Sequence, residues 1–170
     1  MRQLVLPLLL LACLGCAESA SLVANTSRAS QQSTEDFDVT VVQTNTPTVM
    51  RNQHDADVQF DITVKNRTQV PYTVKRITLQ TMAGTTYSIP VTSREYDKTI
   101  APGKEETFGY WARAEVSEIG TARRPMTVRT SIEATDAEGA TRREVFTSRI
   151  NGHVQLQVSD AAVSAAASSR

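Results

Sequence analysis

Few side chains in this sequence are suited to chemistry, and the best candidates are two cysteines and two histidines. Cys13 and Cys16 both stand near the N-terminus, while His54 and His153 lie far apart in the chain. A cysteine thiolate is a nucleophile and a site of covalent modification. A histidine acts as a general base or a metal ligand when suitable groups lie beside it. The residues around these four therefore decide which chemistry each can do.

Both cysteines follow a short apolar segment at the N-terminus. The segment runs from Leu4 to Leu11 after the basic residue Arg2, and it is interrupted by Pro7. A positive residue, an apolar stretch and small residues at a cleavage point are typical of a secretory signal peptide. A membrane-spanning helix would need about 20 apolar residues. We therefore expect residues 1–15 to be a signal peptide rather than a span.

The residues before each cysteine resemble a bacterial lipobox, in which an apolar and a small residue precede the cysteine that receives the lipid. Leu10-Leu11-Ala12-Cys13 and Cys13-Leu14-Gly15-Cys16 both match this pattern. We assign lipidation to Cys16, with Cys13 as the alternative. The resemblance implies a bacterial lipoprotein whose partner is the membrane, reached through its lipid anchor. The competing interpretation is an ordinary secretory signal with two incidental cysteines.

The residue after the lipidated cysteine carries sorting information in Gram-negative lipoproteins, where an Asp implies retention at the inner membrane. Here that residue is Leu14 or Ala17. The resemblance therefore implies a place in the cell envelope, at the outer membrane facing the periplasm if the organism is Gram-negative.

The histidines do not lie in a catalytic or metal-binding pattern. His54, Asp55 and Asp57 are close in sequence, but they match neither His-Glu-x-x-His nor a calcium-binding loop, so we expect a solvated loop. No Gly-x-Ser-x-Gly elbow occurs, and no cysteine follows Cys16. The carboxylates around Tyr96 in residues 93–97 are typical of a polar connection. We expect no enzymatic activity, no metal and no cofactor.

Two arginine pairs are the only hints of an anionic site. Arg123-Arg124 and Arg142-Arg143 could hold a carboxylate or phosphate, although solvated strand-edge charges are the simpler interpretation. Lys plus Arg and Asp plus Glu number 18 each, so the net charge is zero and gives no reason to expect a nucleic-acid partner.

Trp111 is the candidate contact residue. In residues 108–116 the apolar side chains alternate from Phe108 to Val116, which places Trp111 and Arg113 on the outward face. An outward Trp can stack on a sugar or fill a pocket of a protein partner. The alternative is a bulge at Gly109 that turns Trp111 inward.

The elements that must position these residues are strands, because the apolar residues recur with a period of two. We expect a bulge near Lys75-Arg76, where the buried parity changes. We also expect the strand at residues 87–91 to lie near an edge, because Pro90 within it cannot donate to a ladder. The predicted strands lie in residues 37–41, 57–65, 72–79, 87–91, 108–116, 126–134 and 154–158.

Short strands separated by turn residues indicate one antiparallel β-sandwich of about seven to eight strands over residues 36–158. Residues 16–35 are polar and small and are expected to form a flexible stalk, and residues 159–170 a disordered Ala/Ser-rich tail.

Two turn regions of this predicted sandwich resemble known proteins. The residues Lys65-Asn66 before a turn, and later Ala101-Pro102-Gly103 before a strand, resemble the immunoglobulin-like domains of bacterial lipoproteins and of the LEA14-like (water-stress) family. The resemblance implies an immunoglobulin-like fold and no particular activity.

These observations favour a non-catalytic, lipid-anchored envelope protein that acts as an interaction or structural module with an envelope protein partner. A ligand-binding accessory domain for cell-wall or extracellular polysaccharide is the first alternative. An envelope hydrolase with an unrecognised site is the second.

Overall fold

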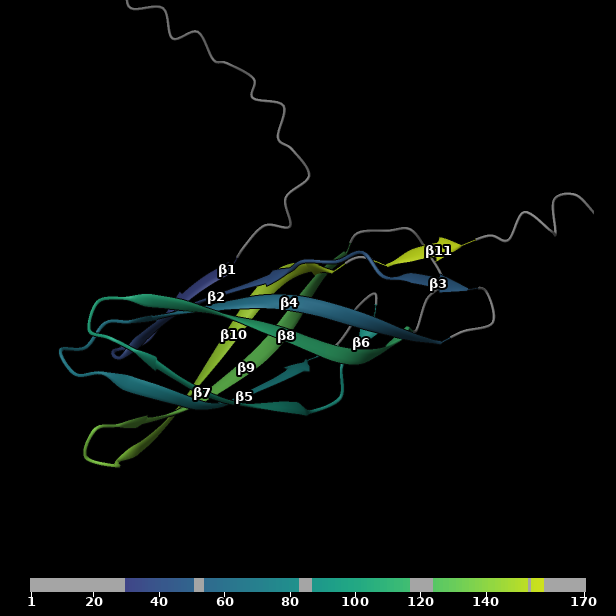
Figure 1. The fold of residues 1–170 in the computed structure, drawn as a ribbon. Coiled ribbons are helices and arrows are strands. Elements are labelled where there is room, and N and C mark those ends of the chain that lie inside the picture. The colour runs from purple at the N-terminus through teal and green to yellow at the C-terminus, as the bar shows by residue number, and fades with distance from the viewer. Residues whose placement is uncertain (1–29, 51–53, 83–86, 117–123, 153, 158–170) are drawn as a thin grey trace, which may run out of the picture.

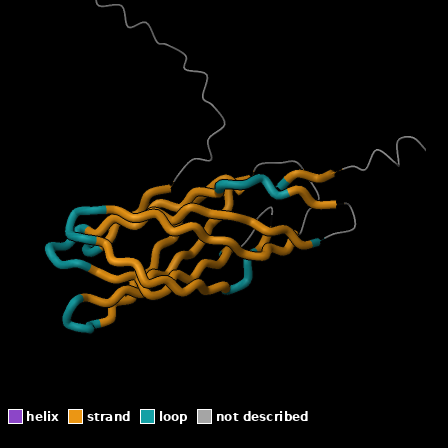
Figure 2. The backbone as a smooth tube through the Cα atoms, viewed as in Figure 1, coloured by secondary structure: helices purple, strands orange, loops and turns teal. Residues whose placement is uncertain are grey.

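The computed structural model describes residues 30–50, 54–82, 87–116, 124–152 and 154–157. Two antiparallel sheets pack face to face as a sandwich, and strands make up most of this part of the chain (Figures 1 and 2). Within the described ranges there is no helix that is long and apolar enough to cross a bilayer. The predicted all-β sandwich is confirmed.

The first sheet has five strands, and the second has four. In spatial order, the five-stranded sheet contains β1 (Ser30–Ser33), β2 (Phe37–Gln43), β4 (Asp55–Asn66), β8 (Glu105–Val116) and β6 (Tyr87–Ser88). The four-stranded sheet contains β10 (Thr141–Gly152), β9 (Arg124–Asp136), β5 (Tyr72–Thr81) and β7 (Thr92–Ile100). Two further strands, β3 (Thr48–Met50) and β11 (Gln155–Gln157), pair in parallel at one end of the sandwich (Figure 1).

The core follows from the alternation along the strands. Successive side chains of a strand point to opposite faces, so each apolar residue of an alternating segment enters the space between the sheets. In β4 the burial alternates without interruption along the strand, and β8 shows the same alternation from Phe108 onward. The largest fully buried side chains are Tyr72, Tyr87, Tyr110, Phe37, Phe60, Phe146, Ile62, Ile77, Leu79, Ile89, Ile100 and Met126.

Two local predictions are confirmed. The pairing of β5 with both neighbours shifts between Val74 and Arg76, which is the expected bulge. The shift keeps Ile77 buried although it has the opposite parity to Val74. The short β6, which is followed by Pro90, is the last strand of its sheet and therefore an edge strand, as predicted.

Four strands lie outside the segments that alternation predicted, and so the described residues form eleven strands rather than seven or eight. They are β1, β3, β7 and β10. Strand β1 lies in residues that we expected to belong to the flexible stalk, and it pairs with β2 from Ser30 to Ser33. Residues 93–97 form the middle of β7 rather than a polar connection. Of the closing segment, Val154 is buried and Val158 lies outside the described residues.

Asn66 explains why the two turn regions noted in the sequence occur together. Its side chain is fully buried, and its Nδ2 donates to the carbonyls of Val70 at 2.7 Å and Ile100 at 3.0 Å. Its Oδ1 accepts from the backbone and the hydroxyl of Thr68. Its carbonyl accepts from Gly103 at 3.0 Å. The buried amide thus joins the turn after β4 to the loop before β8.

Candidate functional site

Trp111 lies on the outer face of the five-stranded sheet and is 54% exposed. The register between β4 and β8 is continuous from Asp55 to Lys65, so no bulge at Gly109 turns the ring inward. The outward position predicted by alternation is therefore present. Trp111 stands opposite Gln59, and Arg113 follows on the same face.

An arginine from the other sheet holds the Trp111 ring in place. The Arg94 guanidinium carbon is 3.4 Å from the centre of the ring, a close cation–π stack. Its Nε and Nη2 also donate to the carbonyl of Trp111 at 3.2 and 3.1 Å. Beside it, the hydroxyl of Tyr96 donates to the carbonyl of Gly109 at 2.9 Å. Side chains of β7 thus bridge to the edge of β8.

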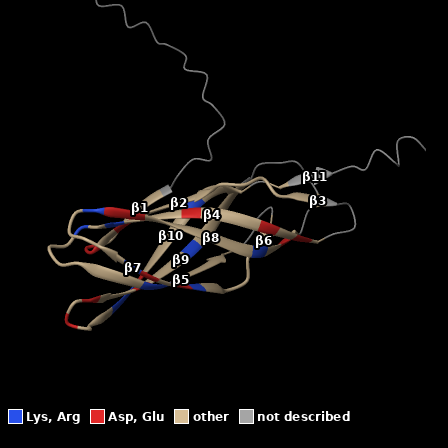
Figure 3. Cartoon of the chain, in the orientation of Figure 1, with Lys and Arg blue, Asp and Glu red and all other residues tan. Residues whose placement is uncertain are grey.

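The surface beside Trp111 is open and mixed in charge. Gly109 is the next outward residue on β8, and a Cβ built there would meet no atom within 4 Å. Asp61 stands opposite Gly109, and Arg113 pairs with Asp55 at 2.7 Å between its Nη2 and Oδ2. Charged residues of both signs are spread over the strands (Figure 3). We call the outward residues Asp55, Gln59, Asp61, Gly109, Trp111 and Arg113 the tryptophan face.

The expected solvated loop around His54 is partly wrong. Asp55 and Asp57 belong to β4, opposite Glu115 and Arg113, and only His54 precedes the strand. His54 is exposed, and its carbonyl accepts a hydrogen bond from Val116. His153 lies outside the described residues. No cluster of three or more potential metal ligands occurs in the part of the chain that the structure describes.

The second arginine pair is divided between the two faces of β10. Arg142 pairs with Asp36 at 2.7 Å, whereas the Nε of Arg143 donates to the hydroxyl of Ser131 at 2.9 Å. Arg123 lies outside the described residues, as do Cys13 and Cys16. Arg124 begins β9. Adjacent arginines on a strand point to opposite sides, so a doublet is not by itself a site.

The titratable groups with shifted pKa values have structural partners. Burial raises the pKa of Tyr110 to about 12, and its hydroxyl donates to the carbonyl of Thr92 at 2.5 Å. Burial also raises the pKa of Glu144, and the nearby Asp36 carboxylate acts in the same direction, against the hydrogen bond with Thr34. These groups lie at junctions between the two sheets and are positioned to stabilise the fold.

Sequence reasoning missed Arg94 and Tyr96 as neighbours of Trp111. They occupy alternate positions on β7, and their side chains are half-buried against β8. Arg94, Tyr96 and Lys98 alternate with other residues at the spacing of a strand, which could have indicated β7. Because these side chains are polar, the segment showed no apolar period.

Comparison with known proteins supports the fold and gives no family. No protein-family model and no curated protein matches the chain. The solved structure of a structural-genomics target called SoR45 is similar with a TM-score of 0.51 and 8% identity, covering 69% of this chain and 88% of that one. A protein from Archaeoglobus fulgidus matches with a TM-score of 0.42 and 15% identity over 75% of this chain and 100% of its own. The GAE domain of yeast GGA1 matches with a TM-score of 0.43 and 11% identity, covering 69% of this chain and 94% of that one.

The last two likenesses are too distant to argue from. The likeness to SoR45 and the two packed antiparallel sheets agree with the predicted architecture. The chain is an immunoglobulin-like β-sandwich.

Proposed function

We propose that this protein is a non-catalytic, lipid-anchored component of the bacterial cell envelope, and that its sandwich binds a protein partner through the tryptophan face. The observation that carries the proposal is the exposure of Trp111 on an ordered strand. A large aromatic side chain that is 54% exposed on a sheet resembles the aromatic anchors that dominate protein interfaces.

The surroundings of Trp111 favour a protein partner over a sugar. Arg94 already stacks on the indole ring, so a sugar ring would have to displace it from that face. A held Trp loses little conformational freedom on binding, and the open position beside Gly109 leaves room for a partner's side chain. Arg113 and Asp61 would form a polar rim.

The anchor and the family remain part of the proposal. The lipobox around Cys16, or alternatively Cys13, supports attachment to a membrane of the envelope. The resemblance of the Lys65-Asn66 and Ala101-Pro102-Gly103 turns supports a relation to LEA14-like domains. Mass spectrometry of the mature N-terminus in Cys13→Ser and Cys16→Ser variants, with membrane fractionation, tests the anchor. A lipid-free N-terminus in the wild type would refute it.

The contact is tested by affinity capture from envelope extracts with the wild type and Trp111→Ala. The matched control is Val145→Ala, which shortens an exposed apolar residue of the other sheet. We expect one partner to be recovered with the wild type and the control and lost with Trp111→Ala. Equal recovery with all three proteins, or with none, would contradict the proposed contact.

The polysaccharide alternative is favoured by the same exposed ring and has its own test. Arg94→Ala uncovers the indole face, so binding of soluble cell-wall glycan should strengthen in that variant if a sugar stacks there. Tryptophan fluorescence during glycan titration measures it. Unchanged fluorescence in both proteins would contradict the polysaccharide alternative.

A further inference from the structure

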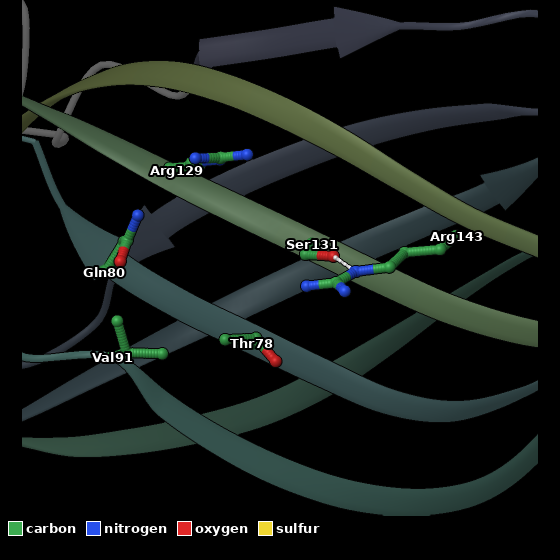
Figure 4. A pocket seen from close by; sticks show the side chains of 6 residues that line it. All are labelled: Thr78, Gln80, Val91, Arg129, Ser131 and Arg143. Atoms are coloured by element: carbon green, nitrogen blue, oxygen red, sulfur yellow. Dashed lines mark hydrogen bonds between the residues drawn. The ribbon is translucent and has the colours of Figure 1, made fainter.

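A second surface feature lies on the outer face of the four-stranded sheet, across the sandwich from Trp111. It is a hollow of about 240 Å³. Figure 4 shows Arg143 reaching from β10 to Ser131 on β9, and around the same space it shows Arg129, the side chains from β5, and Val91, which precedes β7. The lining residues are Thr78, Gln80, Val91, Arg129, Ser131 and Arg143.

The strand register creates this hollow. Thr78 of β5 stands opposite Ser131 of β9 on one side and Ser93 of β7 on the other, so three short hydroxyl side chains form one row across the sheet. The neighbouring rows carry longer side chains: Gln80 opposite Arg129, and Arg76 opposite Glu133. A row of short side chains between rows of long ones leaves a trough.

The two arginines at the hollow differ from most others in the protein. Arg142, Arg113, Arg76 and Arg67 each lie within 4 Å of a carboxylate. Among the described residues, neither Arg129 nor Arg143 has an acidic partner.

Arg143 even stands opposite an acid that it does not bind. Its cross-strand neighbour is Glu133, but its Nε donates to Ser131 instead. The nearest cation to Glu133 is Arg76, at 3.9 Å. Within the described residues, neither arginine of this concave surface is therefore in an ion pair shorter than 4 Å.

The hydrogen-bonding groups of the hollow are mostly donors. Ser131 is only 8% exposed and accepts from Arg143, which leaves its own proton to donate. Thr78 and Ser93 share one hydrogen bond of 2.8 Å, so one of the two hydroxyl protons remains. The guanidinium of Arg129 and the terminal nitrogens of Arg143 add further donors. The side-chain acceptors that these bonds leave in the lining are the carbonyl oxygen of Gln80 and the remaining lone pairs of the hydroxyls.

We propose that this hollow binds an oxyanion, the carboxylate or phosphate group of an envelope solute or polymer. Arginine can donate two parallel hydrogen bonds to the oxygens of either group. A site lined mainly by hydrogen-bond donors favours an anion over a cation. The site is independent of the tryptophan face, because it lies on the opposite sheet. It would let the anchored domain hold an anionic ligand while its other face contacts a protein.

The test is a titration of the full chain with inorganic phosphate and, separately, with glucuronate. Binding is monitored through the NMR chemical shifts of the backbone amides. Arg129→Gln and Arg143→Gln remove the charges, and Arg149→Gln is the matched control, because Arg149 is exposed on the same strand as Arg143 and does not line the hollow. We expect saturable shifts at Thr78, Gln80 and Ser131. Each test variant should weaken binding about tenfold, as expected for a charged hydrogen bond, and the control should leave it unchanged.

Several outcomes would overturn the site. Shifts that sodium chloride reproduces at equal ionic strength would indicate screening only, and an equal loss with Arg149→Gln would indicate diffuse attraction. No saturable shift with either probe would also refute it. Binding of phosphate alone, or of glucuronate alone, would support the site and identify the group. Unchanged shifts elsewhere in each variant confirm that it folds.

Discussion

One buried amide, that of Asn66, determines the geometry of two turns at the same end of the sandwich. Asn66→Ala would leave the carbonyl of Ile100 without this donor in the interior. We expect the free energy of unfolding to fall by about 2–4 kcal/mol, measured by urea denaturation.

Asn45→Ala is the matched control for this prediction. Asn45 bridges to β4 by hydrogen bonds with the backbone of Asp57 and Gln59, but these bonds are solvent-exposed, so water can replace them. Its loss should cost about 0.5–1.5 kcal/mol. Equal costs for the two changes would refute the role of burial.

Glu144 should make stability depend on pH in a defined direction. Its pKa is raised by burial, so as the pH rises the unfolded chain releases this proton before the native protein does. In that interval the native state binds more protons, and the free energy of unfolding decreases with pH. Glu144→Gln removes this decrease. The free energy of unfolding of Glu144→Gln, relative to that of the wild type, should therefore increase from about pH 4 upward.

Urea denaturation of both proteins at several pH values measures the effect of Glu144. The groups facing Glu144 are Thr34, Asp36 and Arg142, and all three are retained in the variant. A difference in stability that stays constant with pH would contradict the prediction.

Residue patterns predicted Trp111 but not Arg129. The exposure of Trp111 follows from the alternation of β8 alone. The hollow at Arg129 requires the register of three strands, since Thr78, Ser131 and Arg143 come from β5, β9 and β10. No local pattern contains that information, and the bulge at Lys75-Arg76 changes which residues of β5 face outward.

At the scale of elements, β7 protects an edge. Strand β8 pairs on its outer side only with the short β6, at Val116 and Glu115. Farther along that edge, Arg94 and Tyr96 donate to the backbone carbonyls of Trp111 and Gly109. Unpaired strand edges favour pairing between molecules, and inward-pointing charged side chains are one natural protection against it.

The double change Arg94→Ala with Tyr96→Phe should therefore promote self-association. Sedimentation velocity over a concentration series should show dimers or larger species that the wild type lacks at the same concentrations. Glu95→Ala, an outward residue of the same strand, is the control and should remain like the wild type. A monomeric double variant would show that the edge is protected by other means.

Three of the four strands missed by alternation, β1, β7 and β10, lack an unbroken apolar period. Strands β1 and β7 lie at or near sheet edges and carry polar residues on both faces, so they show no apolar period. In β10 the inward positions include Ser148, which interrupts the apolar series. These strands form because a partner strand offers hydrogen bonds, which is a tertiary effect. Central strands such as β4, buried on one whole face, were predictable.

At the scale of the whole molecule, the two proposed sites occupy opposite faces of the sandwich. Facing sheets are about 10 Å apart, and distant sites act independently. Trp111→Ala should leave phosphate binding unchanged, and Arg129→Gln should leave partner capture unchanged. The NMR titration measures phosphate binding, and the affinity capture measures partner binding. A loss of both activities with either change would show that the faces are coupled.

The contacts of β1 with β10 also have a mechanical meaning. Force transmitted along the chain before Ser30 reaches β1 ahead of every other described strand. The side chain of Gln32 accepts a hydrogen bond from the amide of Thr147, and the hydroxyl of Thr34 donates one to the carboxylate of Glu144. Asp36 forms an ion pair with Arg142. Strand β1 and the turn after it are therefore bonded to the opposite sheet as well as to β2. Under the proposed lipid anchor, a pull on the chain before Ser30 would be shared by both sheets at once, and the domain would resist being peeled open from that end.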